Sequence, residues 1–475
     1  MSNVTRRDDR RALLDRLPAP GAEDSLIAGS STHSVLFGWL LAVLAGAMWL
    51  IGHLFNEFSF PFVLAFVSSS VLLGLINPAI AAGLTLVIVP FSGGDVSQGL
   101  AEFARSAPML AAAVRIIIDR IRGSSATVTS QKPSRVLFVA AVAAMILYPS
   151  IRFTADGAPW APSETMVDDI FFLMGAPAAM FATWIVVSHI RQETVERLVQ
   201  LVPVALVVAM LSALAAWIGV LAIEQFTFDG KVYGRLAGLG FPTPTAMGVA
   251  IALPLAAAGA LRISRSLAFS VVLLGLVTIV LTESRGPLIA VIVAGAAMLV
   301  MNSRVSIRVY VGAIVLVLVA VAGLAWLRYP ELFQAGTVGR LPDLEGDLLR
   351  VVSWVAGIQI ALQQPLTGGG WMSVRGWNDG ELGDKNVNLS HNLVLQGLAD
   401  GGVPLGASVA VVVLGALRSA WSLRSYLPPA WIASFVALLV CGAWDMPQLR
   451  AFASVMGGMA LGLVCRVEHR PAREP

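Results

Sequence analysis

The sequence predicts an all-α polytopic membrane protein, with about 12–14 transmembrane helices and one long periplasmic loop region. Three observations support this prediction. Of the 475 residues, 57% are hydrophobic and only 13% are charged, whereas a soluble protein carries about 25% charge. Apolar runs recur from Val35 to Cys465, most of them near the roughly 20 residues that cross a bilayer as a helix. The runs are apolar on every side, which excludes the alternating pattern of a β-barrel.

The predicted helices follow one another along the chain, separated by short polar breaks. They cover residues 35–56, 60–76, 78–91, 99–119, 135–151, 167–189, 200–222, 244–261, 266–282, 287–301, 308–327, 402–417, 429–444 and 451–465. The two segments over 78–119 are imperfect and could be re-entrant, which would leave twelve crossings. Either count is even, so both ends of the chain are expected on the same side of the membrane.

The distribution of Lys and Arg orients the bundle, because these residues collect in cytoplasmic loops. It predicts cytoplasmic tails over residues 1–34 and 466–475. Between them we expect a transmembrane bundle over 35–327, a periplasmic loop region with short helices over 328–401, and C-terminal transmembrane helices over 402–465. The first apolar run has no small-residue cleavage site, so it is predicted to be an anchor rather than a removed signal peptide.

Several arginines lie on the outer side, against the orientation rule. Arg235 falls in the loop 223–243, Arg285 at the outer start of a helix, and Arg350 in the long loop region. A single such residue can extend its side chain to lipid phosphates. Several arginines on one side favour an anionic ligand.

His391 is the outer histidine closest to a predicted helix start, in the sequence Ser-His-Asn-Leu. Histidine titrates near neutrality, so it can take a proton from an attacking hydroxyl group. The alternative is that His391 only bonds a neighbour at the start of the helix.

Two further patterns in the long loop region have two interpretations each. The acids Asp343, Glu345 and Asp347 could bind a divalent metal, or Asp347 could cap the helix predicted from Leu348 to Gln363. Gly368–Gly370 could bind a phosphate through backbone amides, or form a turn. We favour the second interpretation of the acids and predict no metal. No basic patch alternates with exposed aromatic residues, so nucleic-acid binding is not expected.

Three short motifs occur in a fixed order: Ser284-Arg285-Gly286, then Arg350…Trp354…Pro365–Gly370, then His391-Asn392-Leu393…Gly401–Gly406. Together they resemble the O-antigen ligase and polysaccharide polymerase superfamily of bacterial envelopes. The segment that begins at Arg235 is also similar to a family element, although Thr243 and Pro244 stand where Asn is common. The motifs span roughly 230–410, less than half of the chain.

The resemblance implies a metal-independent glycosyltransferase with no cofactor, which transfers a glycan from undecaprenyl diphosphate on the periplasmic face of the bacterial inner membrane. It implies that His391 is the catalytic base and that Arg285, Arg350 and the less closely matched Arg235 bind the diphosphate. Asn392 would be a further substrate contact. Arginine suits this role, because its planar fork binds phosphate oxygens bidentately and keeps its charge.

The acceptor stays open within this family. An O-antigen ligase transfers the finished glycan to lipid A–core, whereas an O-antigen or exopolysaccharide polymerase extends lipid-linked repeat units; we favour the ligase. The expected partners are therefore the undecaprenyl-diphosphate-linked glycan, one of these acceptors, and membrane lipids. A transporter of lipid-linked sugars would carry ionisable groups at mid-membrane in repeated halves. Here Arg105 and Arg115 are the main mid-span charges and no repeat is visible.

Overall fold

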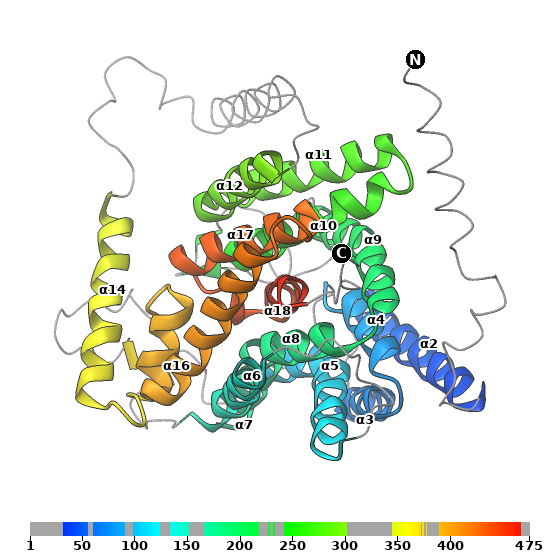
Figure 1. Cartoon of the computed structure of the whole chain (residues 1–475), viewed down its shortest axis with the longest axis horizontal. Helices are drawn as coiled ribbons and strands as arrows, with labels where there is room; N and C mark the ends of the chain where they lie inside the picture. Colours follow the sequence, from blue (N-terminus) through cyan, green and yellow to red (C-terminus); the bar gives the residue numbers. More distant parts are fainter. Residues whose placement is uncertain are drawn as a thin grey trace, which may run out of the picture.

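The computed structural model describes residues 32–55, 60–90, 98–123, 134–151, 166–217, 227–228, 231–232, 242–301, 344–371, 373–374, 377 and 389–466. Helices account for nearly all of these residues (Figure 1). They are α2 (Thr32–Phe55), α3 (Phe60–Ile76), α4 (Pro78–Ile88), α5 (Gln98–Ile121), α6 (Arg135–Leu147), α7 (Met166–Leu173), α8 (Ala179–His189), α9 (Gln192–Trp217), α10 (Pro242–Leu261), α11 (Arg265–Leu281), α12 (Arg285–Met301), α14 (Leu344–Gln363), α16 (Leu393–Ser422), α17 (Pro429–Trp444) and α18 (Ala451–Val464). The predicted all-α architecture is confirmed.

Three irregular turns and one small hairpin complete the described elements. The π-helical turn η3 (Met174–Ala178) joins α7 to α8, inside the single helix predicted over 167–189. Its Pro177 has no backbone N–H to continue an α-helical ladder. The 3-10 turns are η2 (Tyr148–Ser150) and η5 (Pro447–Leu449). The two-residue strands β1 (Thr227–Phe228) and β2 (Lys231–Val232) pair antiparallel.

Most helices lie within a few residues of their predicted bounds, and α3 and α17 match at both ends. α9 begins at Gln192 rather than at residue 200. The added turns contain Glu193 and Glu196, which favour helix formation, and Glu193 lies at the positive end of the helix. The helix predicted over 308–327 lies outside the described residues.

The helix predicted to follow Asp347 begins earlier, at Leu344. Asp347 therefore lies within the first turn of α14 and is not its N-cap, so that prediction was wrong. Asp343 falls outside the described residues. The metal alternative for the acid cluster stays untested.

The helix predicted over 402–417 is the second part of a longer element, α16. It begins at Leu393 and bends at Gly402, whose φ of 68° lies in the left-handed region that favours glycine. The carbonyl oxygen of Pro365 accepts a 2.7 Å bond from the amide of Val403, just after the bend. A side chain at Gly402 would also collide with this carbonyl. The bend turns the start of α16, with His391 before it, away from the main axis of the helix.

The protein is a membrane protein with many apolar helices. Four described segments are long and apolar enough to cross a bilayer: 169–189, 192–215, 243–261 and 393–422. Eight further apolar helices contain 10–17 residues each. Large apolar side chains such as Trp39, Val136 and Trp421 are exposed, which suits contact with lipid. The predicted count of 12–14 crossings stays a prediction.

Helix α18 lies at the centre of the bundle (Figure 1) and contacts α8, α10, α16 and α17. Every one of its residues is buried. Gly458 allows close approach, because a side chain there would collide with the carbonyl oxygen of Met180 in α8. Small residues permit such close packing where helices associate in a membrane. The loop before α18 is thereby held in a fixed place, and this loop carries part of the candidate active site.

Candidate active site

The predicted site residues that the structure describes lie on or next to three helices, α12, α14 and α16. His391 and Asn392 directly precede α16, Arg350 lies in α14, and Arg285 is the first residue of α12. α14 packs against α16, and α12 packs along α17, which lies between α12 and α16 in Figure 1. Arg235 lies outside the described residues.

His391 contacts an acid that the sequence analysis did not single out. Its Nδ1 atom lies 3.4 Å from Oδ1 of Asp445, the residue that follows α17. The histidine side chain is 33% exposed and the aspartate side chain 16% exposed. The pair is therefore sheltered, but one side of the imidazole ring remains accessible. The distance is long for a hydrogen bond, as catalytic bonds often are without substrate.

The surroundings of Asp445 keep it ionised. Burial alone would raise the pKa of its carboxyl group. Hydrogen bonding and charge from His391, the amide of Met446 at 2.9 Å and the charge of Arg350 outweigh burial and lower this pKa below its ordinary value. A carboxylate only accepts hydrogen bonds, so Nδ1 of His391 must carry the proton that it donates. In the neutral ring the Nε2 atom then keeps its lone pair, as a general base requires.

Two observations place Arg350 at the same site: its charge acts on Asp445, and Trp354, one turn later in α14, contacts α17. The charge of Arg350 contributes to the lowered pKa of Asp445. One turn later, the ring of Trp354 lies 6.0 Å from that of Trp444, the last residue of α17. This aromatic pair joins α14 to the end of α17. Arg350 and Asp445 are thus held at the same end of the bundle.

Arg285 lies at the adjoining end of α12. The hydroxyl of Ser284 donates a 3.3 Å hydrogen bond to the hydroxyl of Thr243 in α10. A side-chain carbon at Gly286 would be in ordinary contact with Trp444, at 3.8 Å from its Cβ atom. The start of α12 is therefore next to the end of α17, and its N-terminal backbone adds positive potential to that of Arg285.

Asn392 has a structural task in addition to its predicted substrate contact. Its Oδ1 atom accepts from the amides of Val394 and Leu395 at 3.0 and 3.1 Å, which caps α16. Its Nδ2 atom donates to the carbonyl oxygen of Ala443 at 3.4 Å. Asn392 thus ties the start of α16 to the end of α17, and the substrate contact stays a prediction.

The glycine run does not form a phosphate cradle in this structure. The amides of Gly368, Gly369 and Gly370 donate to the carbonyl oxygens of Gln364, Ala399 and Asp400, respectively. A side chain at Gly368 would also collide with the backbone of α16. These glycines allow the loop after α14 to approach the bend in α16, which agrees with the alternative interpretation as a turn.

Asp445 had a signal in the sequence that could have identified it. It is an acid between two apolar segments, 429–444 and 451–465. The charge-based orientation puts it on the same side of the membrane as His391. An acid and a histidine on one side of a bundle are candidates for a catalytic pair. The pairing itself, however, could not be predicted, because 54 positions separate the two residues and only the packing of the helices brings them together.

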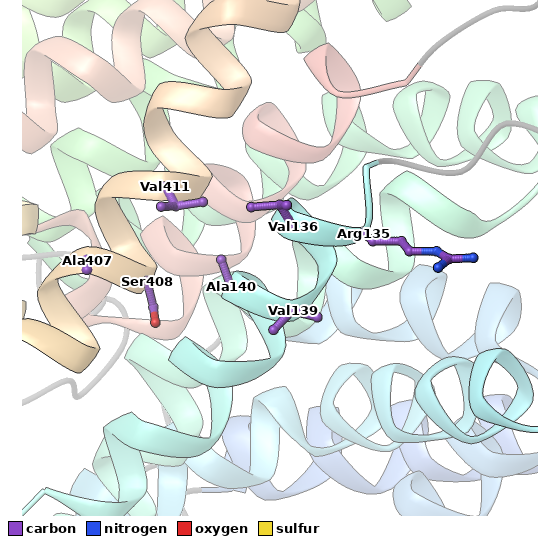
Figure 2. Close-up of a pocket in the computed structure, with 7 residues that line it drawn as sticks. All are labelled: Arg135, Val136, Val139, Ala140, Ala407, Ser408 and Val411. Carbon is purple, nitrogen blue, oxygen red and sulfur yellow. The ribbon is translucent and has the colours of Figure 1, made fainter.

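A shallow cavity of about 420 Å³ lies elsewhere, between α6 and α16. Val136, Val139 and Ala140 line it from α6, and Ala407, Ser408 and Val411 line it from α16 (Figure 2). The guanidinium group of Arg135 points away from the other six side chains in Figure 2. None of the predicted site residues lines this cavity.

Comparison with known proteins supports the family drawn from the motifs. No curated protein matches the chain. The O-antigen ligase family matches residues 270–410, under a third of the chain. This segment contains Arg285, Arg350, His391 and Asn392, but not Arg235 or Asp445. The match supports glycosyl transfer of the ligase or polymerase type with lipid-linked polysaccharide substrates, and it confirms that this membrane protein is related to the O-antigen ligase superfamily.

Proposed function

We propose that the protein transfers a glycan from undecaprenyl diphosphate to lipid A–core, at the periplasmic face of the bacterial inner membrane. The observation that carries the proposal is the His391–Asp445 pair, with Arg350 acting on the same carboxylate. A base with a fixed tautomer beside cationic side chains suits the attack of a hydroxyl group on a sugar with an anionic leaving group.

In the proposed reaction, His391 is the base. A hydroxyl group of the acceptor gives its proton to Nε2 while its oxygen forms a bond to the anomeric carbon of the donor glycan. The bond from that carbon to the diphosphate oxygen breaks, and its electron pair leaves with undecaprenyl diphosphate. Asp445 is a positioning residue in this step: its negative charge stabilises the imidazolium form of His391.

The arginines stabilise the departing diphosphate. Arg350 and Arg285 hold its oxygens, and Arg235 is a third candidate for this task. Charge builds up on the leaving group in the transition state, where fixed cationic donors act most strongly. Asn392, beside His391, borders the bound substrate. The donor already carries an activated leaving group, so the proposed step draws on no nucleotide or metal.

The periplasmic location rests on the distribution of basic residues. His391 precedes α16, whereas Arg418 and Arg424 lie near the other end of this helix. Likewise Asp445 lies between α17 and α18, whereas Arg466 follows the far end of α18. Lys and Arg collect on the cytoplasmic side. The opposite end, with His391, is therefore assigned to the periplasm.

The test is a deletion strain complemented with wild-type protein or with His391→Ala. Lipopolysaccharide and free polysaccharide from each strain are compared on a gel. We expect the deletion and the His391→Ala strain to lose long glycan on lipid A–core while lipid-linked polymer accumulates. Core that carries a single repeat unit would instead assign a polymerase. Normal lipopolysaccharide with His391→Ala, at equal protein level in the membrane, would contradict the proposal.

A further inference from the structure

The backbone at His391 has an unusual conformation. Its φ of 47° lies in the left-handed region, which residues other than glycine rarely adopt. Such a conformation persists only where the surroundings hold it. The residue before it, Ser390, is completely buried. The contacts of Ser390 therefore show what fixes this part of the backbone.

A buried chain of hydrogen bonds leads from Ser390 into α16. The amide and the hydroxyl of Ser390 both donate to Oε1 of Gln396, at 2.8 and 3.0 Å. The Nε2 atom of Gln396 donates to Oδ2 of Asp400 at 2.6 Å. Gln396 is 1% exposed and Asp400 is fully buried. The spacing of four residues places both side chains on the same face of the helix.

Asp400 is anchored from a second direction. Its backbone carbonyl accepts the 3.1 Å bond from the amide of Gly370, and the neighbouring carbonyl of Ala399 accepts from Gly369 at 2.7 Å. Oδ1 of Asp400 has no hydrogen-bond partner in the part of the chain that the structure describes. Its side chain therefore makes one hydrogen bond there, to Gln396. A carboxyl group on an apolar membrane helix is costly to bury, and such groups commonly serve function.

We propose that Gln396 and Asp400 are positioning residues: they hold Ser390 in place, so that His391 keeps its left-handed backbone conformation and its ring stays in contact with Asp445. Asp400 fixes the amide of Gln396 in the orientation that presents Oε1 to Ser390. Gln396 then occupies both donors of Ser390, directly before the base. The inference rests on the proposed role of His391 in glycan transfer.

The test compares transfer kinetics of purified full-length variants with a lipid-linked donor. Gln396→Met keeps the length of the side chain but removes the two bonds from Ser390 and the bond to Asp400. It is expected to lower kcat about 10²-fold, the scale of a small misplacement of a catalytic group, with little change in KM. Asp400→Leu is expected to lower kcat similarly, whereas Asp400→Asn keeps an acceptor for Gln396 and should restore most of the rate. Ser408→Ala is the control, because this hydroxyl donates to the carbonyl of Pro404 in the same helix, away from Ser390 and Gln396.

The values of kcat and KM distinguish a variant that misplaces His391 from a variant that fails to fold. A protein that elutes as wild type in detergent, with reduced kcat, unchanged KM and rescue by Asp400→Asn, supports the inference. Wild-type kcat in Gln396→Met, or equal losses in Asp400→Asn and Asp400→Leu, would overturn it. His391→Ala is measured in the same assay. An inactive His391→Ala with a normal Gln396→Met rejects only this inference, whereas an active His391→Ala rejects the proposed function itself.

Discussion

The Nδ1 atom of His391 lies 3.4 Å from the Oδ1 atom of Asp445, although 54 positions separate the two residues in the sequence. One residue precedes α16 and the other follows α17. Both helices must therefore be in place before the pair can form. In the proposed mechanism this contact orients His391 as the base, and the first two predictions follow from it.

Replacement of the acid is expected to reduce glycan transfer strongly. Asp445→Asn removes the charge that stabilises the imidazolium and can present an N–H to Nδ1, which would select the wrong tautomer. We expect the rate to fall between roughly 10²- and 10⁴-fold. Asp119→Asn is the matched control, because Asp119 pairs with Arg115 on α5, away from this site. Equal rates for wild type and Asp445→Asn would contradict the assignment.

The lowered pKa of Asp445 predicts how stability depends on pH. The pKa is below the ordinary value of 3.8 in the folded protein, so the unfolded chain binds more protons in the range between the two values. The stabilisation is complete above the unfolded value and is lost as the pH falls through the folded one. The Tm difference between wild type and Asp445→Asn should thus narrow as the pH falls below about 4. A difference that widens below about pH 4 would contradict this.

The arginines are expected to act as bidentate forks rather than as simple positive charges. Arg350→Lys and Arg285→Lys each keep the charge but lose the planar pair of donors. The transfer rate should fall by about 10²-fold in either variant. Arg424→Lys provides the control: this arginine stacks on Trp421, with its guanidinium carbon 4.7 Å from the ring centre, near the other end of α16. If both site variants kept the wild-type rate, diphosphate binding there would be rejected.

The packing of α18 predicts a stability effect without a change of chemistry. Gly458→Ala would place a methyl group against the backbone carbonyl of Met180, which cannot rotate away. Overpacking of this kind costs about 1–3 kcal/mol. Gly83→Ala is the control, because its new methyl group would meet Leu201 at an ordinary distance of 3.6 Å. Thermal unfolding in detergent should show a lower Tm than wild type for Gly458→Ala but not for Gly83→Ala. Equal Tm values for Gly458→Ala and wild type would argue against tight α8–α18 packing.

Much of the fold could be predicted because a bilayer leaves the backbone few options. A helix satisfies its own polar groups, so the apolar runs in the described part of the chain form helices. Local residues then mark the ends: Pro428 and Pro429 begin α17, and Asn77 caps α4 directly before Pro78. The bend at Gly402 was not predicted, because the expected helix began at residue 402, whereas α16 begins at Leu393 and continues through the bend.

The site could be predicted only in part, for a different reason. His391, Arg285 and Arg350 stand in short motifs that can be recognised locally. Asp445 becomes part of the site only through packing of distant helices, and no local pattern shows that contact. The amides of Gly369 and Gly370 illustrate the same limit, because their acceptors, the carbonyl groups of Ala399 and Asp400, lie thirty residues later.

The most direct test of the account is transfer in vitro by purified protein in a lipid bilayer. Undecaprenyl-diphosphate-linked glycan and lipid A–core are supplied, and both the glycosylated product and released undecaprenyl diphosphate are measured. We expect wild type to form both in equal amounts and His391→Ala to form less than about one hundredth of either. A His391→Ala protein that forms both at the wild-type rate would contradict the central claim that this residue is the base.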